Sequence, residues 1–346
     1  MAKAAKKKSA KKRPAEKKKQ SGEGLVSRLR GMWSFGHNKK EEHGSPSDDL
    51  FFEMLEDGLL DDGKSGNPEP FDGNDADEGE PEQPPDEMVL PDSWPESRLH
   101  IVQRIWGKDF LKPGGEKNVS ELIRPLALNG DHTVLDIGAG LGGSSRTIAR
   151  ETGARVSGFE ANADLATAAM ELSKMAGMAR KAPIRALAPE GPDLKARSVN
   201  AMFSKEALYK IEDKEAMLAA VQETLRPHAQ ILLTDYIEVG SGKISPEMEA
   251  WTTSERSPAH LWRIENYKDY FESRNYRVHV AEDITEKYYH DVVTGFTEFS
   301  NTIKSFRGNK EMEEWSVKEA EFWVRRMAPF ESGELGVCRI FAQKMD

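Results

Sequence analysis

From residue 89 onward, short apolar runs alternate with amphipathic stretches, which predicts a succession of strands and helices. Strands are predicted at 133–137, 154–160, 199–204, 230–235, 276–280 and 335–342. Helices are predicted at 120–126, 144–151, 163–175, 214–225 and 267–273. This alternation is typical of a parallel sheet that helices cover on both faces. We therefore expect an α/β, doubly wound fold over residues 89–346.

The first 88 residues lack this alternation and divide into three segments. Residues 1–23 form a polybasic tail that we expect to be disordered, because residues 1–20 hold ten Lys and Arg against one acid. Residues 24–60 contain short amphipathic segments, one of them around Trp33. Residues 61–88 read as an acidic Pro/Gly linker with no potential to form a core.

The basic tail and the amphipathic segments leave several interpretations open. A basic, Trp-containing amphipathic turn beside a polybasic run is similar to an interfacial anchor, so residues 1–60 are candidates to bind an anionic membrane surface or a protein partner. A solvated tail is the alternative. The acidic main body argues against a folded nucleic-acid-binding domain.

The cysteine content and the hydropathy exclude several classes. Cys338 is the only cysteine, so neither an intrachain disulfide nor a cysteine-based zinc site can form. No apolar run approaches the ~20 residues of a membrane span. We expect no metal and a cytoplasmic location, peripheral to the inner face of a membrane if the amphipathic turn binds lipid.

The strongest chemical signal is the run at 134–143, where a predicted strand leads into glycines and then a helix. Ligands of doubly wound sheets bind at such turns, at the carboxyl ends of strands. Gly138 and Gly140 allow close approach to a ligand, and Asp136 can accept hydrogen bonds or receive a cation. Glu160 ends the next strand, where a carboxylate can accept both hydroxyls of a ribose. The glycine spacing differs from that of a dinucleotide fingerprint.

The sequence Asp-Ile-Gly-Ala-Gly at 136–140 resembles motif I of class I methyltransferases that depend on S-adenosyl-L-methionine (SAM). Stretches at 105–115, 203–211 and 232–236 resemble the phosphoethanolamine N-methyltransferases. This resemblance implies a Rossmann-like class I methyltransferase sheet with SAM as cofactor. It implies that the cofactor contacts Leu111, Lys112, Asp136, Gly138, Gly140, Glu160, Ala161 and Lys205.

The acceptor side departs from that family. A family Tyr near the N-terminus is replaced by Trp94, and the His of the fourth-strand stretch by Lys210. Among the family's phosphate-binding residues only Tyr236 is unchanged. The candidate catalytic residues are therefore Trp94, Lys210 and Tyr236.

Two more family positions are substituted. The acid beside adenine falls near Ala188, and an Arg-x-Tyr pair falls near Ser257 and Ala259, with Arg256 and His260 flanking it.

Three further groups allow both a functional and a structural interpretation. Glu206 either orients an amine or is a solvated residue at a helix start. The cluster at 288–290 either walls an acceptor pocket or packs as an ordinary helix. We expect a solvated helix face, rather than a metal site, from Glu311, Glu313, Glu314 and Glu319. Trp315, Phe322 and Trp323 are expected in the core.

Two functions follow from these observations. The first is a SAM-dependent methyltransferase acting on a small amine, a lipid headgroup or another small polar acceptor. The alternative is a methyltransferase-like, non-catalytic scaffold or regulator that acts through its charged N-terminal tails.

Overall fold

A computed structural model describes residues 94–240, 244–255 and 258–346 of the chain. The polybasic tail, the amphipathic segments and the acidic linker lie outside these residues. The predictions made for them therefore stay predictions.

A seven-stranded sheet forms the centre of the described region, with the strand order β3-β2-β1-β4-β5-β7-β6. Strands β1 to β5 pair in parallel, whereas β7 runs antiparallel to both β5 and β6. The prediction of a parallel sheet is therefore wrong at this edge. The strands are β1 (Thr133–Ile137), β2 (Arg155–Glu160), β3 (Ile184–Ala186), β4 (Val199–Lys205), β5 (Leu225–Glu238), β6 (Tyr276–Asp283) and β7 (Leu335–Lys344).

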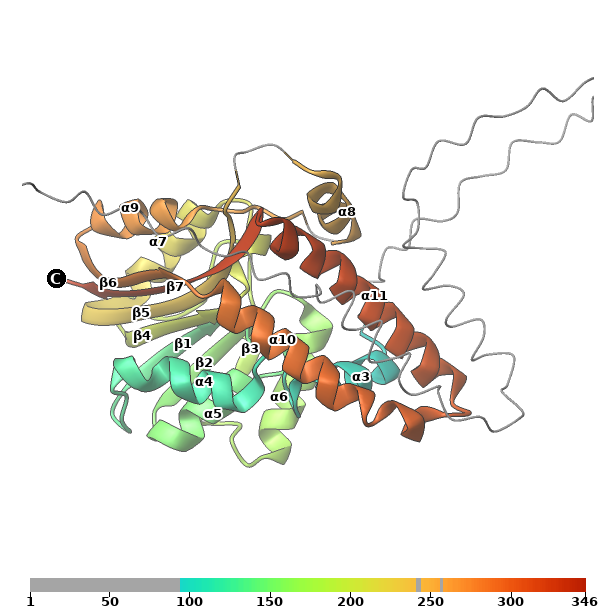
Figure 1. Cartoon of the computed structure of the whole chain (residues 1–346). Coiled ribbons are helices and arrows are strands. Elements are labelled where there is room, and N and C mark those ends of the chain that lie inside the picture. The colour runs from blue at the N-terminus through green and yellow to red at the C-terminus, as the bar shows by residue number, and fades with distance from the viewer. Residues whose placement is uncertain (1–93, 241–243, 256–257) are drawn as a thin grey trace, which may run out of the picture.

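Helices cover both faces of the sheet (Figure 1). Helices α7 and α9 lie on one face, and α4, α5 and α10 lie on the other. Helices α3, α8 and α11 gather beyond the carboxyl ends of the parallel strands, where α11 packs on both α3 and α8. The bounds are α3 (Glu96–Trp106), α4 (Gly115–Ile123), α5 (Gly143–Thr152), α6 (Ala163–Met175), α7 (Lys214–Thr224), α8 (Pro246–Ser254), α9 (Ile264–Glu272), α10 (Thr285–Ser300) and α11 (Lys310–Ser332).

The strands divide the core into two layers because successive side chains point to opposite faces of a sheet. In β1, Val134 belongs to the layer under α4 and α10, while Leu135 and Ile137 belong to the layer under α7 and α9. Asp136 therefore shares the face of Val134. Among the buried residues of β1, Asp136 is the polar one, and it lies at the site described below.

Helix α11 is joined to α3 by a buried ion pair. Glu319 is 2% exposed, and its Oε1 accepts a hydrogen bond from Arg98 Nε at 2.5 Å. Glu311 accepts a hydrogen bond from Ser97 Oγ at 2.6 Å. The predicted solvated acidic face is thus wrong at Glu319. The core prediction is confirmed for Trp315 and Trp323, and Phe322 is half-buried against the same core.

No helix among the described residues combines the length and the apolar character needed to cross a membrane.

Candidate functional site

The turn after β1 requires glycine at two positions. Gly138 and Gly140 have φ values of +77° and +56°, a region that residues with a side chain rarely adopt. A Cβ on Gly138 would lie 2.1 Å from the Cβ of Ala207, and one on Gly140 would lie 3.3 Å from Leu111 Cδ1. The backbone of the turn can therefore approach a ligand without an intervening side chain.

The Gly138→Ala substitution is expected to destabilise the fold by about 3 kcal/mol, because left-handed strain and a steric clash add. Gly177→Ala is the matched control, since Gly177 has a φ of +69° and a Cβ placed on it would meet nothing within 4 Å. It should cost only about 1 kcal/mol. Urea unfolding of both variants measures the difference, and equal losses would contradict the importance of the contact with Ala207.

The carboxylate of Glu160 is positioned at the end of β2 by two backbone donors. Its Oε2 accepts from the N–H of Gly140 at 2.8 Å, and its Oε1 accepts from the N–H of Asn162 at 3.0 Å. The side chain is half-buried, and Ala161 follows it at the start of the turn into α6. Each carboxylate oxygen keeps a lone pair for a further donor, such as a hydroxyl of a ribose.

Asp136 is 1% exposed and accepts a hydrogen bond from Ser145 Oγ of α5 at 2.6 Å. Burial raises the pKa of Asp136 to about 6, although the bond from Ser145 and the charge of Lys112 act in the opposite direction. The carboxyl group therefore changes its charge close to neutral pH.

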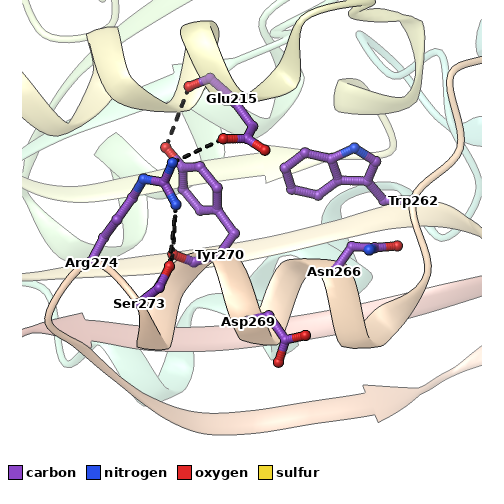
Figure 2. Close-up of a pocket in the computed structure, with 7 residues that line it drawn as sticks. All are labelled: Glu215, Trp262, Asn266, Asp269, Tyr270, Ser273 and Arg274. Carbon is purple, nitrogen blue, oxygen red and sulfur yellow. Dashed lines mark hydrogen bonds and ion pairs between the residues drawn. The ribbon is translucent and has the colours of Figure 1, made fainter.

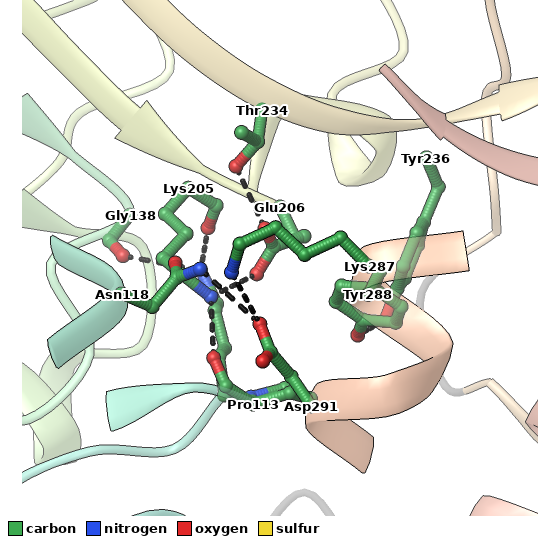
Figure 3. Close-up of polar contacts among 11 residues, drawn as sticks. Pro113, Asn118, Gly138, Lys205, Glu206, Thr234, Tyr236, Lys287, Tyr288 and Asp291 are labelled. Carbon is green, nitrogen blue, oxygen red and sulfur yellow. Dashed lines mark hydrogen bonds and ion pairs between the residues drawn. The ribbon is translucent and has the colours of Figure 1, made fainter. Parts of the chain in front are cut away.

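Two lysines connect the segment around Pro113 to the ends of β1 and β4. Lys112 Nζ donates to the carbonyls of Gly138, at 3.4 Å, and of Lys205. Lys205 Nζ donates to the carbonyl of Pro113 and to Glu206, both at 2.8 Å. Figure 3 shows Lys205 in contact with Pro113 and Glu206, with Gly138 nearby.

Glu206 is a buried member of this network. Its second carboxylate oxygen accepts a hydrogen bond from Thr234 Oγ1 at 2.7 Å, and its φ is +40°. The interpretation of Glu206 as a solvated residue at a helix start is therefore wrong. Its charge is balanced by Lys205 within the site.

The sequence analysis did not identify Arg146, whose side chain holds the glycine-rich turn in place. The buried guanidinium donates to the carbonyl of Leu141 at 2.7 Å and pairs with Asp109 at 3.0 Å. It also reaches Ser173 Oγ of α6 at 3.1 Å. An arginine inside a predicted helix carries no local signal of this role, because two of its partners, Asp109 and Ser173, come from distant segments.

The candidate acceptor residue Tyr236 is buried in an aromatic cluster. Its hydroxyl lies 2.5 Å from that of Tyr288 in α10, and the two rings meet edge to face at 5.7 Å. Burial raises the pKa of both tyrosines. The remaining rings of this cluster are those of Tyr209, Trp251 and Phe330.

Lys210 lies beside a buried ion pair that sequence reasoning also missed. Arg326 of α11 pairs with Glu255, which follows α8 and also accepts from Trp251 Nε1 at 3.0 Å. Lys210 Nζ is 3.8 Å from the same carboxylate, although the Lys210 side chain is 48% exposed. Desolvation lowers the pKa of Lys210, and the charge of Glu255 partly offsets this.

The candidate catalytic residues are therefore only partly brought together. Lys210 and Tyr236 flank the ion pair of Glu255 and Arg326. Lys210 lies beside Glu255, and the guanidinium carbon of Arg326 is 5.6 Å from the centre of the Tyr236 ring. Trp94 instead packs under Arg98 of α3. The guanidinium carbon of Arg98 lies 4.1 Å from the centre of the Trp94 ring.

Of the other substituted family positions, Ala188 and the flanking His260 lie within the described residues. Ala188 and Glu190 are exposed in a tight turn that a bridge from Ala188 to Gly191 closes. His260 donates its backbone N–H to the carbonyl of Tyr209 at 2.7 Å, while residues 256–257 lie outside the described residues.

An open pocket of about 350 Å³ lies between α7 and α9, away from this site (Figure 2). It contains none of the residues discussed above. Its walls are Glu215, Trp262, Asn266, Asp269, Tyr270, Ser273 and Arg274.

The strand order, the glycine turn after β1 and the acid at the end of β2 match those expected of a class I SAM-dependent methyltransferase fold. Residues 135–233 match the family model described as a methyltransferase domain.

The sequence is also similar to those of several phosphoethanolamine N-methyltransferases. The phosphoethanolamine N-methyltransferase of Triticum aestivum is 25% identical over 197 residues, which are 56% of this chain and 37% of that protein. The phosphoethanolamine N-methyltransferase of Plasmodium falciparum is 23% identical over 193 residues, which are 54% of this chain and 70% of that protein.

The structure of Haemonchus contortus phosphoethanolamine N-methyltransferase 2, in complex with phosphomonomethylethanolamine and S-adenosylhomocysteine, has a TM-score of 0.63. It is 19% identical, over 72% of this chain and 57% of that one, and so shows a shared fold. The chain spans little more than a third of the length of the first curated relatives it matches. Its domain resembles those of the phosphoethanolamine N-methyltransferases.

Proposed function

We propose that the chain transfers a methyl group from SAM to a small amine, a lipid headgroup or another small polar acceptor. The observation that carries this proposal is the carboxylate of Glu160, which two backbone N–H groups hold beside the glycine turn. The match of residues 135–233 to a methyltransferase domain favours the enzyme over the scaffold interpretation.

The residues at the strand ends suit the parts of SAM. Glu160 would accept the ribose hydroxyls, with Ala161 beside it, and the turn of Gly138 and Gly140 would face the methionine portion. Leu111 packs against Gly140 and would cover that portion. SAM supplies an activated methyl group on a sulfonium, so transfer needs in-line placement of the acceptor more than it needs acid–base chemistry.

The acceptor would lie on the side of Lys210 and Tyr236, which flank the pair of Glu255 and Arg326. Several matched relatives are named phosphoethanolamine N-methyltransferases, but this chain has other residues at most of the positions that the family uses for the phosphate group. Lys210 takes the place of the family's His and is the candidate catalytic residue on this side; desolvation lowers its pKa, whereas Glu255 at 3.8 Å favours its charged form. Glu206 is the candidate to hold that acceptor as a cation.

SAM binding is expected to weaken about tenfold when the pH falls from 7 to 5. Asp136 loses its negative charge as the pH passes below its pKa of about 6, and a neutral carboxyl attracts the cationic cofactor less. Isothermal titration calorimetry across this range measures the effect. Asp136→Asn should flatten the profile, and a tenfold change that persists in that variant would assign it to another group.

The proposed function is tested by binding and then by turnover. Micromolar binding of SAM and S-adenosylhomocysteine by the full chain is expected in calorimetry. Transfer of a radioactive methyl group should then be screened over phosphoethanolamine, simple amines, amino acids and lipid headgroups in vesicles. Absence of cofactor binding at millimolar concentration would sink the proposal.

A further inference from the structure

The carboxylate of Glu255 is held by charged and polar donors at the end of α8. Its Oε1 accepts hydrogen bonds from Arg326 Nε and from Trp251 Nε1, both at 3.0 Å. A second nitrogen of Arg326, Nη2, donates to the same oxygen. Oε2 lies 3.8 Å from Lys210 Nζ, and the side chain is only 2% exposed. Two cations therefore share an anion that belongs to the protein itself.

The backbone also fixes the position of this carboxylate. The N–H of Glu255 donates to the carbonyl of Trp251 at 3.1 Å, where α8 ends. Trp251 is fully buried, and α8 packs on α11, which carries Arg326. Trp251 thus holds Glu255 through both its main chain and its indole ring. The carboxylate is therefore a fixed part of the acceptor side.

Arg326 is the buried cation beside the candidate acceptor residue Tyr236. Its guanidinium carbon lies 5.6 Å from the centre of the Tyr236 ring, and 4.2 and 4.7 Å from those of Phe322 and Trp323. A guanidinium enclosed in this way binds a carboxylate or a phosphate strongly, because charge-assisted hydrogen bonds gain strength where water is excluded. In this chain that capacity is used by Glu255.

A second carboxylate acts on the same place. Glu206, like Glu255, interacts electrostatically with Tyr236. Lys205 pairs with Glu206 at 2.8 Å, and Arg326 pairs with Glu255. An anionic acceptor beside Tyr236 would therefore face two carboxylates and would find the buried cation already paired.

These contacts bear on which acceptors the site can admit. We propose that Glu255 is a specificity-determining residue, whose carboxylate occupies the anion-binding capacity of Arg326 and Lys210 and so excludes acceptors with a phosphate or carboxylate group at this place. Discrimination of this kind comes from placing a like charge against the wrong ligand. The inference rests on the proposed function and narrows it, because it favours simple neutral or cationic amines over phosphorylated headgroups.

The test replaces the resident anion with an external one. Glu255→Gln removes the charge and keeps the size of the side chain, so Arg326 and Lys210 should then bind inorganic phosphate. At about 20 mM phosphate, the melting temperature of the full chain with this substitution should rise by roughly 3 °C relative to sodium chloride of equal ionic strength. The unmodified chain carries the same polybasic tail and should show no such difference. Differential scanning calorimetry measures both.

Two control variants separate anion binding from a general change of stability. Glu249→Gln removes an exposed acid from α8 and should respond as the unmodified chain does. The double variant Glu255→Gln with Arg326→Met lacks the buried cation as well, so it should lose the response to phosphate. A purely structural role of Glu255 would lower the melting temperature without making it depend on phosphate.

The outcomes decide the inference separately from the proposed function. A phosphate response confined to Glu255→Gln supports it, whereas an equal response in the unmodified chain, or none in any protein, overturns it. If Glu255→Gln does not fold, the unmodified chain saturated with S-adenosylhomocysteine decides. Saturable binding of phosphoethanolamine in calorimetry would then overturn the inference, and its absence at millimolar concentration would support it. Failure of S-adenosylhomocysteine itself to bind would sink the proposed function, while the phosphate response would still report on Glu255.

Discussion

Glu160→Ala is expected to weaken the binding of SAM by about 100-fold or more. The substitution removes the proposed ribose contacts and also frees the backbone donors of Gly140 and Asn162, which the carboxylate holds at 2.8 and 3.0 Å. The protein would thus lose the carboxylate that contacts the ribose and, at the same time, the hydrogen bonds that order the turn. Calorimetric titration of both SAM and S-adenosylhomocysteine measures the loss.

Two further variants sharpen this test. Glu160→Gln keeps one acceptor oxygen, so it should lose affinity by only about tenfold. Glu190→Ala removes an exposed acid from the turn that follows β3 and should leave the affinity unchanged. Unchanged binding in Glu160→Ala, with the protein folded, would remove the observation on which the proposed function rests.

Arg326→Met is expected to destabilise the domain by about 3–5 kcal/mol, because it leaves the carboxylate of Glu255 buried without its main partner. Lys210, at 3.8 Å, can compensate only in part. A loss of this size corresponds to a fall in the melting temperature of roughly 10 °C for a domain of this length. Differential scanning calorimetry measures it.

The double variant Arg326→Met with Glu255→Gln is the control for this prediction. Removing both charges takes away the unpaired buried carboxylate, so the double variant should regain much of the lost stability. If the two losses simply add, the contacts of the Arg326 guanidinium with the rings of Phe322 and Trp323, rather than charge pairing with Glu255, carry the stability.

Elements with strong local periodicity were predictable from the sequence. The strand at 133–137 and the helix at 163–175 have the predicted bounds. The apolar run of the first ends at glycines, and Asn162 caps the second by accepting from the N–H groups of Asp164 and Leu165. In both cases the information lies within a few residues of the boundary.

Features that depend on distant partners were not predictable. The direction of β7 is set by its pairing with β5 and β6, and an apolar strand has the same pattern in either direction. Glu319 looked solvated because its partner Arg98 lies 221 positions away. The motif around Gly138 was found, whereas Arg146 and the pair of Glu255 and Arg326 left no local pattern.

The position of β7 has a consequence for the order in which the chain can fold during synthesis. β6 is made before β7, yet within the sheet β6 pairs only with β7, which lies between it and β5. While the ribosome is still adding residues 335–344, β6 therefore has no strand to join, and the exposed edge of β5 has none either. We expect the half of the sheet that carries the glycine turn to form first, with the β5 edge open to aggregation or chaperone binding until the last strand is inserted.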